Sequence, residues 1–212
     1  MAAAAASSFA GAGSAEAEIH YSGNVSIELT LNAQARLPLS NGASLAFRNV
    51  FAGSTFVQWF FFQMEGVISG SARGYDQHYG RIFLSALDAR KNVSDGRFYS
   101  VAGNPDHGVL FTNWSDGQFA SPADGFAAFR FNTGKGTQYG WARIKTLTGS
   151  NGHVHDLIKD YAWGDVGDAI LTGQRHSLQP AKANSIAGSL GLLAFGAQGL
   201  DAWRTQCREK SD

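Results

Sequence analysis

The sequence predicts an all-β protein: an antiparallel β-sandwich of jelly-roll type, followed by a short C-terminal hydrophobic helix. Three observations lead to this prediction. Apolar and polar residues alternate in several segments of the chain, and turn-forming residues separate those segments. Glycine is abundant, with 26 of the 212 residues, which suits a chain of many turns. Charged residues make up only 16% of the chain, against about 25% in a typical soluble domain.

Residues 1–17 are predicted to be an export leader or the remnant of a signal peptide. The stretch consists almost entirely of small residues and ends in Ala15-Glu16-Ala17, the A-x-A pattern of secretory cleavage sites. An ordinary disordered Ala/Gly/Ser leader is the alternative. On either interpretation these residues lie outside the fold, which we expect to occupy residues 18–174.

The strands predicted within residues 18–174 rest on period-two patterns. In residues 25–32 (VSIELTLN) apolar and polar side chains alternate strictly, as in a strand with one buried face. Residues 56–64 (FVQWFFFQM) are almost all apolar, as expected of a strand covered on both faces. Turn signals such as Asn-Gly and Asp-Gly lie between the segments. Further strands are expected at residues 43–51, 81–87, 126–132, 138–148, 155–163 and 168–173.

The same alternation assigns side chains to the two faces of each strand. Phe129 and Phe131 should share one face of their strand, because residues two apart point the same way. In the following strand, Tyr139 and Trp141 should lie opposite Ala142 and Ile144. The leading candidates for the core are Trp59, Phe61, Phe129, Phe131 and Trp141.

The C-terminal part of the chain differs in composition from the predicted domain. Residues 175–187 are polar and small, contain Pro180, and are predicted to be a linker. Residues 188–212 are predicted to be a hydrophobic helix with a basic tail. The apolar run 186–200 would be roughly 22 Å long as a helix, shorter than a hydrocarbon core of about 30 Å. We therefore expect transient membrane contact, with an amphipathic helix packed on the domain as the alternative.

This C-terminal order of proline-containing linker, short Gly/Ala/Leu helix, "AWR" and basic end resembles the sorting tag of PEP-CTERM proteins in degenerate form. Those are exported bacterial proteins that an exosortase processes. The chain has Gln179-Pro180 where the family has a Pro-Glu-Pro signature, and its arginines are dispersed. The residues that carry the resemblance to the tag are Pro180, Gly188, Leu190, Leu192, Leu193, Trp203 and Arg204.

A second resemblance to the same family lies inside the predicted domain. "FAAFRFNTGKGTQYGWARIK" and "IKDYAWGDVGDAILTGQ" are similar to a strand pair and a following segment that recur in these exported proteins. The resemblance implies a cell-envelope or extracellular β protein, with an exosortase-type sorting enzyme as partner, from a family that often occurs in organisms making exopolysaccharide. The matching residues are Phe129, Arg130, Phe131, Tyr139, Gly140, Trp141, Ala142, Tyr161, Ala162, Gly167, Ile170 and Gly173.

Two groups of residues are candidates for metal binding. His153 and His155 are two apart, so in a strand both imidazoles point to the same face, with Asp156 as the neighbouring carboxylate. Ordinary surface histidines are the alternative. Oxygen ligands for calcium are available in a turn that lacks the dense spacing of a calcium loop, so solvated aspartates are favoured there. These aspartates are Asp160, Asp165 and Asp168.

Aromatic side chains between the predicted strands are candidates for stacking on sugar rings. Trp114, Tyr75 and Tyr79 each lie beside polar residues, with buried or edge-protecting aromatics as the alternative. No spacing pairs two carboxylates as a glycosidase requires, and no G-x-S-x-G motif is present. We therefore predict no enzymatic activity and no cofactor.

The predicted function follows from these features together. The formal net charge is zero, which argues against nucleic-acid binding. The leading prediction is a non-enzymatic, exported protein of the cell surface or extracellular matrix, associated with exopolysaccharide or with copies of itself. One alternative is a carbohydrate-binding or carbohydrate-active β-sandwich protein. A further alternative is a self-assembling structural subunit.

Overall fold

The computed structural model describes residues 18–52, 57–77, 81–101, 109–112, 117–120, 123–149 and 153–177. All of them belong to one compact unit, Ala17–Ser177. The described residues form strands, turns and one 3-10 turn, Ser40–Gly42, and contain no α-helix. The predicted all-β class is therefore confirmed, whereas the predicted C-terminal helix lies outside the described residues.

No helix in the described part of the chain has the length and apolar character needed to cross a lipid bilayer.

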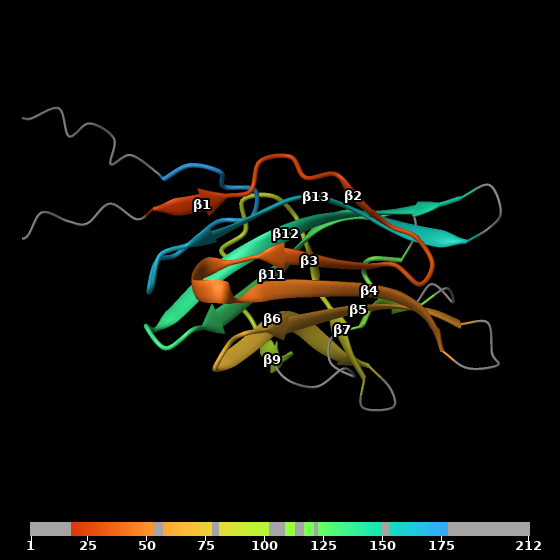
Figure 1. Cartoon of the computed structure of the whole chain (residues 1–212), viewed down its shortest axis with the longest axis horizontal. Helices are drawn as coiled ribbons and strands as arrows, with labels where there is room; N and C mark the ends of the chain where they lie inside the picture. Colours follow the sequence, from red (N-terminus) through yellow and green to blue (C-terminus); the bar gives the residue numbers. More distant parts are fainter. Residues whose placement is uncertain are drawn as a thin grey trace, which may run out of the picture. The chain divides into compact units, whose positions relative to one another are not determined.

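The strands are connected mainly by antiparallel pairing (Figure 1). One pairing, between β7 and β10, is parallel. Their bounds are β1 (Ile19–Tyr21), β2 (Ile27–Leu29), β3 (Gln34–Pro38), β4 (Ser44–Ala52), β5 (Val57–Glu65), β6 (Ser69–Gln77), β7 (Arg81–Leu84), β8 (Ala86–Leu87), β9 (Phe98–Ser100), β10 (Val109–Thr112), β11 (Ala123–Asn132), β12 (Thr137–Thr148) and β13 (Val154–Gly164).

Strand β6 joins two groups of strands. The hydrogen-bonded path runs β1-β13-β12-β11-β6-β7-β10-β5-β4-β3. The first half of β6 pairs with β11, with Ala72 opposite Phe129, and the second half pairs with β7, with Gly74 opposite Leu84. The strands on either side of β6 therefore form two groups, β11–β13 and β3–β5, that are linked through one long strand.

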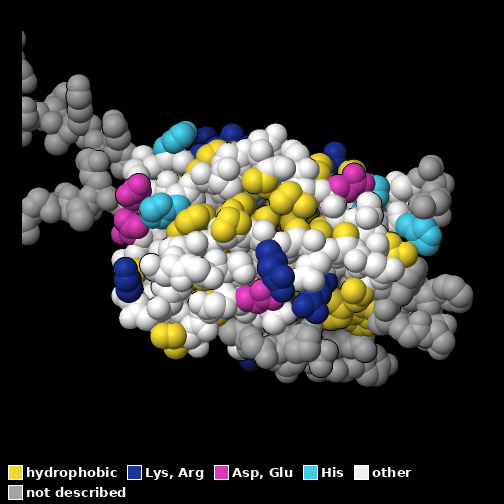
Figure 2. Space-filling view, viewed as in Figure 1, with side chains coloured by type: hydrophobic (Ala, Val, Ile, Leu, Met, Phe, Trp, Pro, Cys, Tyr) yellow, Lys and Arg dark blue, Asp and Glu magenta, His cyan; other side chains and the backbone are white. Residues whose placement is uncertain are grey.

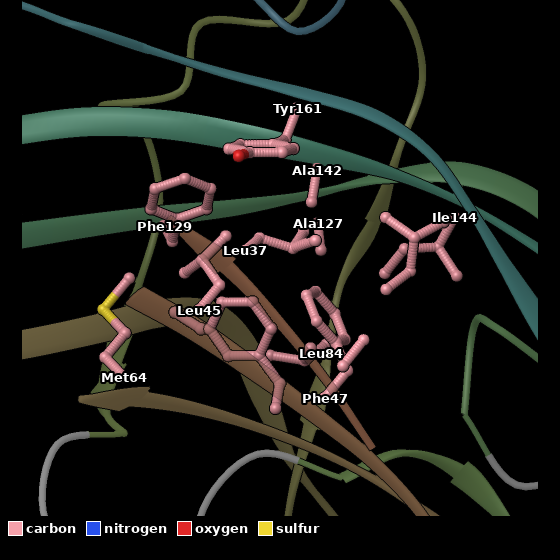
Figure 3. Packing of buried hydrophobic residues seen from close by; sticks show 14 of the residues in the cluster. Leu37, Leu45, Phe47, Met64, Leu84, Ala127, Phe129, Ala142, Ile144 and Tyr161 are labelled. Carbon is pink, nitrogen blue, oxygen red and sulfur yellow. The ribbon is translucent and has the colours of Figure 1, made fainter. Parts of the chain in front are cut away.

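The main hydrophobic core lies between these two groups (Figure 3). Phe47 and Phe62 from one group meet edge to face at 5.1 Å between ring centroids, and Phe62 contacts Phe129 from the other at 6.2 Å. Ile144 and Tyr161, also from the β11–β13 group, belong to the same core cluster. Burial of these side chains holds the two groups together, because apolar area removed from water is the main favourable contribution to folding.

A second, smaller cluster covers the opposite face of β12. Trp141 is fully buried there with Ile170, and Tyr139 packs against it, whereas Ala142 and Ile144 belong to the main core. The predicted division of faces in this strand is therefore confirmed. Phe129 and Phe131 are at most 1% exposed and both belong to the main core, so their predicted shared face is also confirmed.

The other two core candidates differ from that pattern. Trp59 is 8% exposed and forms a third cluster with Phe83, and Phe61 is only partly buried beside them. Both aromatic rings therefore stabilise a local region between β5 and β7 rather than the main core.

Two predicted strands are wrong in extent. The alternating segment 25–32 forms a strand only at Ile27–Leu29, because Ser26 (φ 47°) and Asn32 (φ 61°) adopt left-handed backbone conformations that end an extended strand. Residues 168–173 form no strand. Leu171 makes an isolated bridge to Asn92 instead.

Candidate functional site

The structure places an open groove of about 370 Å³ beside β1 and β13. Its lining combines side chains from β1, from the β1–β2 loop, from β12 and β13, and from the segment after β13. We call it the Asp160 groove, and it is lined by Tyr21, Asn24, Ser26, Arg143, Leu157, Lys159, Asp160 and Arg175.

A β-bulge in β13 directs two consecutive charged residues to the groove. Arg143 on β12 pairs with Asp160, but the next residue, Ile144, pairs with Ile158, so Lys159 has no partner residue across the ladder. The extra residue interrupts the alternation of faces. Lys159 and Asp160 therefore both line the groove, although adjacent residues of a regular strand would point apart.

The β1–β2 loop is held against this bulge by backbone hydrogen bonds. Val25 donates its N–H to the carbonyl of Lys159 at 2.9 Å, and Ser22 donates to the carbonyl of Tyr161 at 3.0 Å. Ser26 lines the groove with a left-handed backbone, which costs a non-glycine residue about 1–3 kcal/mol. These bonds attach the loop, and with it one wall of the groove, to β13.

Asp160 is the centre of the charge arrangement, although it is fully buried. Arg143 donates to it through Nε at 2.8 Å and through Nη2 at 2.9 Å, which is a bidentate pair. Arg175 donates through Nη2 at 3.0 Å, and the Tyr21 hydroxyl donates at 2.8 Å. Burial and the hydrogen bond to Asp160 raise the pKa of Tyr21, so the phenol stays protonated and keeps its donor.

The groove has more positive than negative charge. Three cationic side chains and the carboxylate of Asp160 line it. One of the three, Lys159, is paired with Asp124 at 2.7 Å, so the excess of positive charge comes from the two arginines around Asp160. Arg175 is 46% exposed and lies over the Tyr21 ring at 5.2 Å, and Arg143 is 27% exposed. Each guanidinium carries five N–H donors and uses only one or two of them on Asp160. The remaining N–H donors have the chemistry to bind a polar, negatively charged group.

The two oxygens of Asp160 accept hydrogen bonds from three side chains, Tyr21, Arg143 and Arg175. Hydrolysis of a glycosidic bond requires two positioned carboxyl groups, and the groove lining supplies one.

The structure separates the members of the first predicted metal group. His153 and His155 both line a small hollow of about 240 Å³, as their spacing predicts, and His155 Nε2 lies 3.4 Å from a carboxylate oxygen of Glu28. Asp156 points to the other face of β13, where it is 1% exposed and accepts a hydrogen bond from Thr146 at 2.7 Å. Adjacent strand residues face apart, so Asp156 does not join the two histidines.

The predicted group of turn aspartates is divided in the same way. Asp160 is bound by the two arginines of the groove, and Asp165 contacts His20 at 3.0 Å. Asp168 donates its backbone N–H to the carbonyl of Asp165 in the turn. The three do not form one oxygen-ligand cluster.

Of the predicted sugar-stacking aromatics, only Tyr75 lies within the described residues. It stacks on Phe83 at 6.0 Å between ring centroids and packs in the cluster around Trp59. Tyr75 therefore packs against other aromatic side chains, which is the alternative that the sequence offered to sugar stacking. Trp114, Tyr79 and the residues of the C-terminal tag lie outside the described residues.

Sequence reasoning missed the groove residues Tyr21, Arg143 and Arg175. The consecutive Lys159-Asp160 pair, which interrupts an otherwise alternating segment, is the one local signal that points to the site.

The fold and the groove together define an all-β domain with a polar, arginine-lined groove at one face of β12 and β13. Comparisons of the chain with protein-family models, with curated proteins and with solved structures find no match.

Proposed function

We propose that this chain is an exported, non-enzymatic protein of the cell surface or extracellular matrix. Its β domain, a sandwich of jelly-roll type, binds acidic exopolysaccharide in the Asp160 groove. The observation that carries the proposal is the excess of guanidinium donors, from Arg143 and Arg175, around one carboxylate that is already fully bonded.

The chemistry of the groove suits a uronic acid unit. Arginine binds a carboxylate through paired N–H donors, and such charge-assisted bonds are about twice as strong as neutral ones. The Tyr21 ring supplies an apolar surface beside Arg175. The Lys159 ammonium is already paired with Asp124 at 2.7 Å, so recognition of the acid group rests on the two arginines. Because the groove is open, a long polymer can cross it without threading through the protein.

The export part of the proposal rests on the two ends of the chain. Residues 1–17 act as the leader, and residues 188–212 act as a sorting helix that contacts the membrane transiently and is recognised by an exosortase-type enzyme. The resemblance to PEP-CTERM proteins supports this assignment. Fractionation of the cells that produce the protein tests it: we expect the chain in the envelope or medium, without residues 1–17. Recovery of the whole chain in the cytoplasm would contradict it.

Self-assembly through strand edges is less well supported. Strand β3 ends the path of paired strands, but it carries Arg36, whose side chain is 58% exposed, and it ends at Pro38. Charge and proline on an edge strand disfavour pairing with another chain.

Binding of the full-length protein to a polyuronate and to neutral dextran tests the groove. We expect binding to the polyuronate alone, weakened by salt. Arg175→Gln should reduce the affinity by about tenfold to a hundredfold, since one charge-assisted contact is worth about 1.5–3 kcal/mol. Arg36→Gln is the matched control, because Arg36 is also an exposed arginine bound to one carboxylate, that of Glu65.

Two results would contradict the proposal. Equal affinity for both polymers would exclude recognition of the acid group, and unchanged affinity of Arg175→Gln would exclude this groove. Release of reducing sugar from the polyuronate would favour the carbohydrate-active alternative.

A further inference from the structure

Three potential metal ligands converge where β1 begins. They are Glu18, His20 and Asp165, and one ligand atom from each lies within 4.8 Å of the other two. Within the described ranges this is the one group of three such residues that meets that distance. Figure 2 shows a histidine against acidic side chains on the left of the molecule, where Figure 1 places β1.

The register of β1 and β13 brings these side chains to one face. His20 lies opposite Trp163, and Asp165 donates its N–H to the carbonyl of Glu18 at 3.2 Å. Glu18 and His20 are two apart on an extended chain, so their side chains point the same way. Tyr21, the next residue, faces the Asp160 groove instead.

The imidazole of His20 is held in place before any ion binds. Its ring stacks on the Trp163 indole, with centroids 5.2 Å apart and planes 22° from parallel. Its Nε2 lies 3.0 Å from Oδ1 of Asp165. Stacking and the ladder around it limit the rotation that would separate these two atoms, which is how neighbouring groups orient a metal ligand.

We propose that Glu18, His20 and Asp165 form a binding site for a divalent first-row transition metal ion of the Zn²⁺ type. Zinc binds imidazole nitrogen and carboxylate oxygen at about 2.0–2.2 Å, so ligand atoms around a tetrahedral ion lie about 3.3–3.5 Å apart. The observed 3.0 Å between His20 and Asp165 needs only a small opening to admit the ion.

The ligand types and charges select this class of metal. Two carboxylates balance the charge of a divalent cation. The imidazole nitrogen favours zinc-like ions over Ca²⁺, which takes six to eight oxygen ligands. His20 is 34% and Asp165 48% exposed at the side chain, so water can occupy the fourth position.

Metal binding at this site would hold β1 on β13. Strand β1 has only three residues, and one of them is Tyr21, whose hydroxyl donates to Asp160. The ion therefore stabilises the strand that forms one wall of the groove. The site itself does not depend on the polysaccharide proposal, because it is built from different side chains.

Titration of the full-length, EDTA-treated protein with ZnCl₂ at pH 7.5 tests the site. Calorimetry should give one site per chain, and the ¹⁵N resonances of the His20 ring should shift. The isosteric variants Glu18→Gln and Asp165→Asn should each weaken Zn²⁺ binding about tenfold or more. Zn²⁺ should raise the Tm of the unmodified protein and not that of Asp165→Asn.

His155→Gln is the matched control, because His155 forms the other histidine–carboxylate pair of the described residues and has no third ligand in reach. It should bind Zn²⁺ as the unmodified protein does. Three results would overturn the proposal: no binding of Zn²⁺, which leaves a plain His20–Asp165 ion pair; unchanged affinity in both isosteric variants; or loss of binding in His155→Gln.

Discussion

Raising the pH from 5 to 8 should destabilise this protein through one buried carboxyl group. Asp156 lies on β13 with its side chain in the interior, and it is 1% exposed. Thr146 donates a hydrogen bond to Oδ1 at 2.7 Å, while Oδ2 has no partner among the described residues. Burial raises the pKa of Asp156 from 3.8 to about 8, and the bond from Thr146 opposes that rise only in part.

The sign and size of the effect follow from proton binding in the two states. Between pH 4 and 8 the folded chain holds a proton on Asp156 that the unfolded chain has released, so the free energy of unfolding falls as pH increases. At about 1.4 kcal/mol per pH unit, the loss between pH 5 and 8 is on the order of 4 kcal/mol. Above pH 8 this group causes no further loss, because both states are then ionised. The loss is large against a total stability of about 5–15 kcal/mol for a typical domain.

Urea denaturation at several pH values, followed by tryptophan fluorescence, measures this dependence. Asp156→Asn has the shape of the protonated acid and keeps an oxygen for Thr146, so its stability should be nearly constant between pH 5 and 8 and should exceed that of the unmodified protein at pH 8. Asp95→Asn, at an exposed turn position, is the control and should retain the original slope. The reasoning is refuted if Asp156→Asn shows the same slope as the unmodified protein, or if the unmodified protein is equally stable at both pH values.

Two further changes test the packing of the strands. Gly140→Ala should lower the free energy of unfolding by about 1–3 kcal/mol, because the added Cβ would overlap the Phe129 ring and lie 2.7 Å from a backbone carbonyl oxygen. Gly164→Ala is the control, because its Cβ would meet nothing closer than 3.5 Å. Equal Tm values for the two variants would contradict this reasoning. The Gln58 amide accepts a hydrogen bond from the N–H of Val154 at 3.2 Å and donates one to the carbonyl of Val154. Gln58→Met should therefore lower the free energy of unfolding by about 2–4 kcal/mol, because both of these buried backbone groups would lose a partner. A denaturation midpoint unchanged by Gln58→Met would show that this bond contributes nothing to stability.

The candidate sites depend on contacts between distant residues, which the sequence did not predict. The spacing of His153 and His155 predicted that the two side chains share a face, since residues two apart in a strand point the same way. Both line one hollow in the structure. The same spacing did not reveal the groove, because the bond from Tyr21 to Asp160 joins residues 139 positions apart. A local pattern contains no information on which distant strands become neighbours.

The sequence by itself determined the all-β class, the faces of β11 and β12, and the burial of Phe129 and Trp141. These are local properties, set by the period-two geometry of an extended chain and by the cost of leaving apolar area in water. Only the tertiary structure decided that β1 and β12 flank β13, that the bulge turns Lys159 and Asp160 to the same side, and that Asp156 points inward. Those outcomes depend on strand pairing and register over long distances in sequence, where one inserted residue reverses every side chain that follows it.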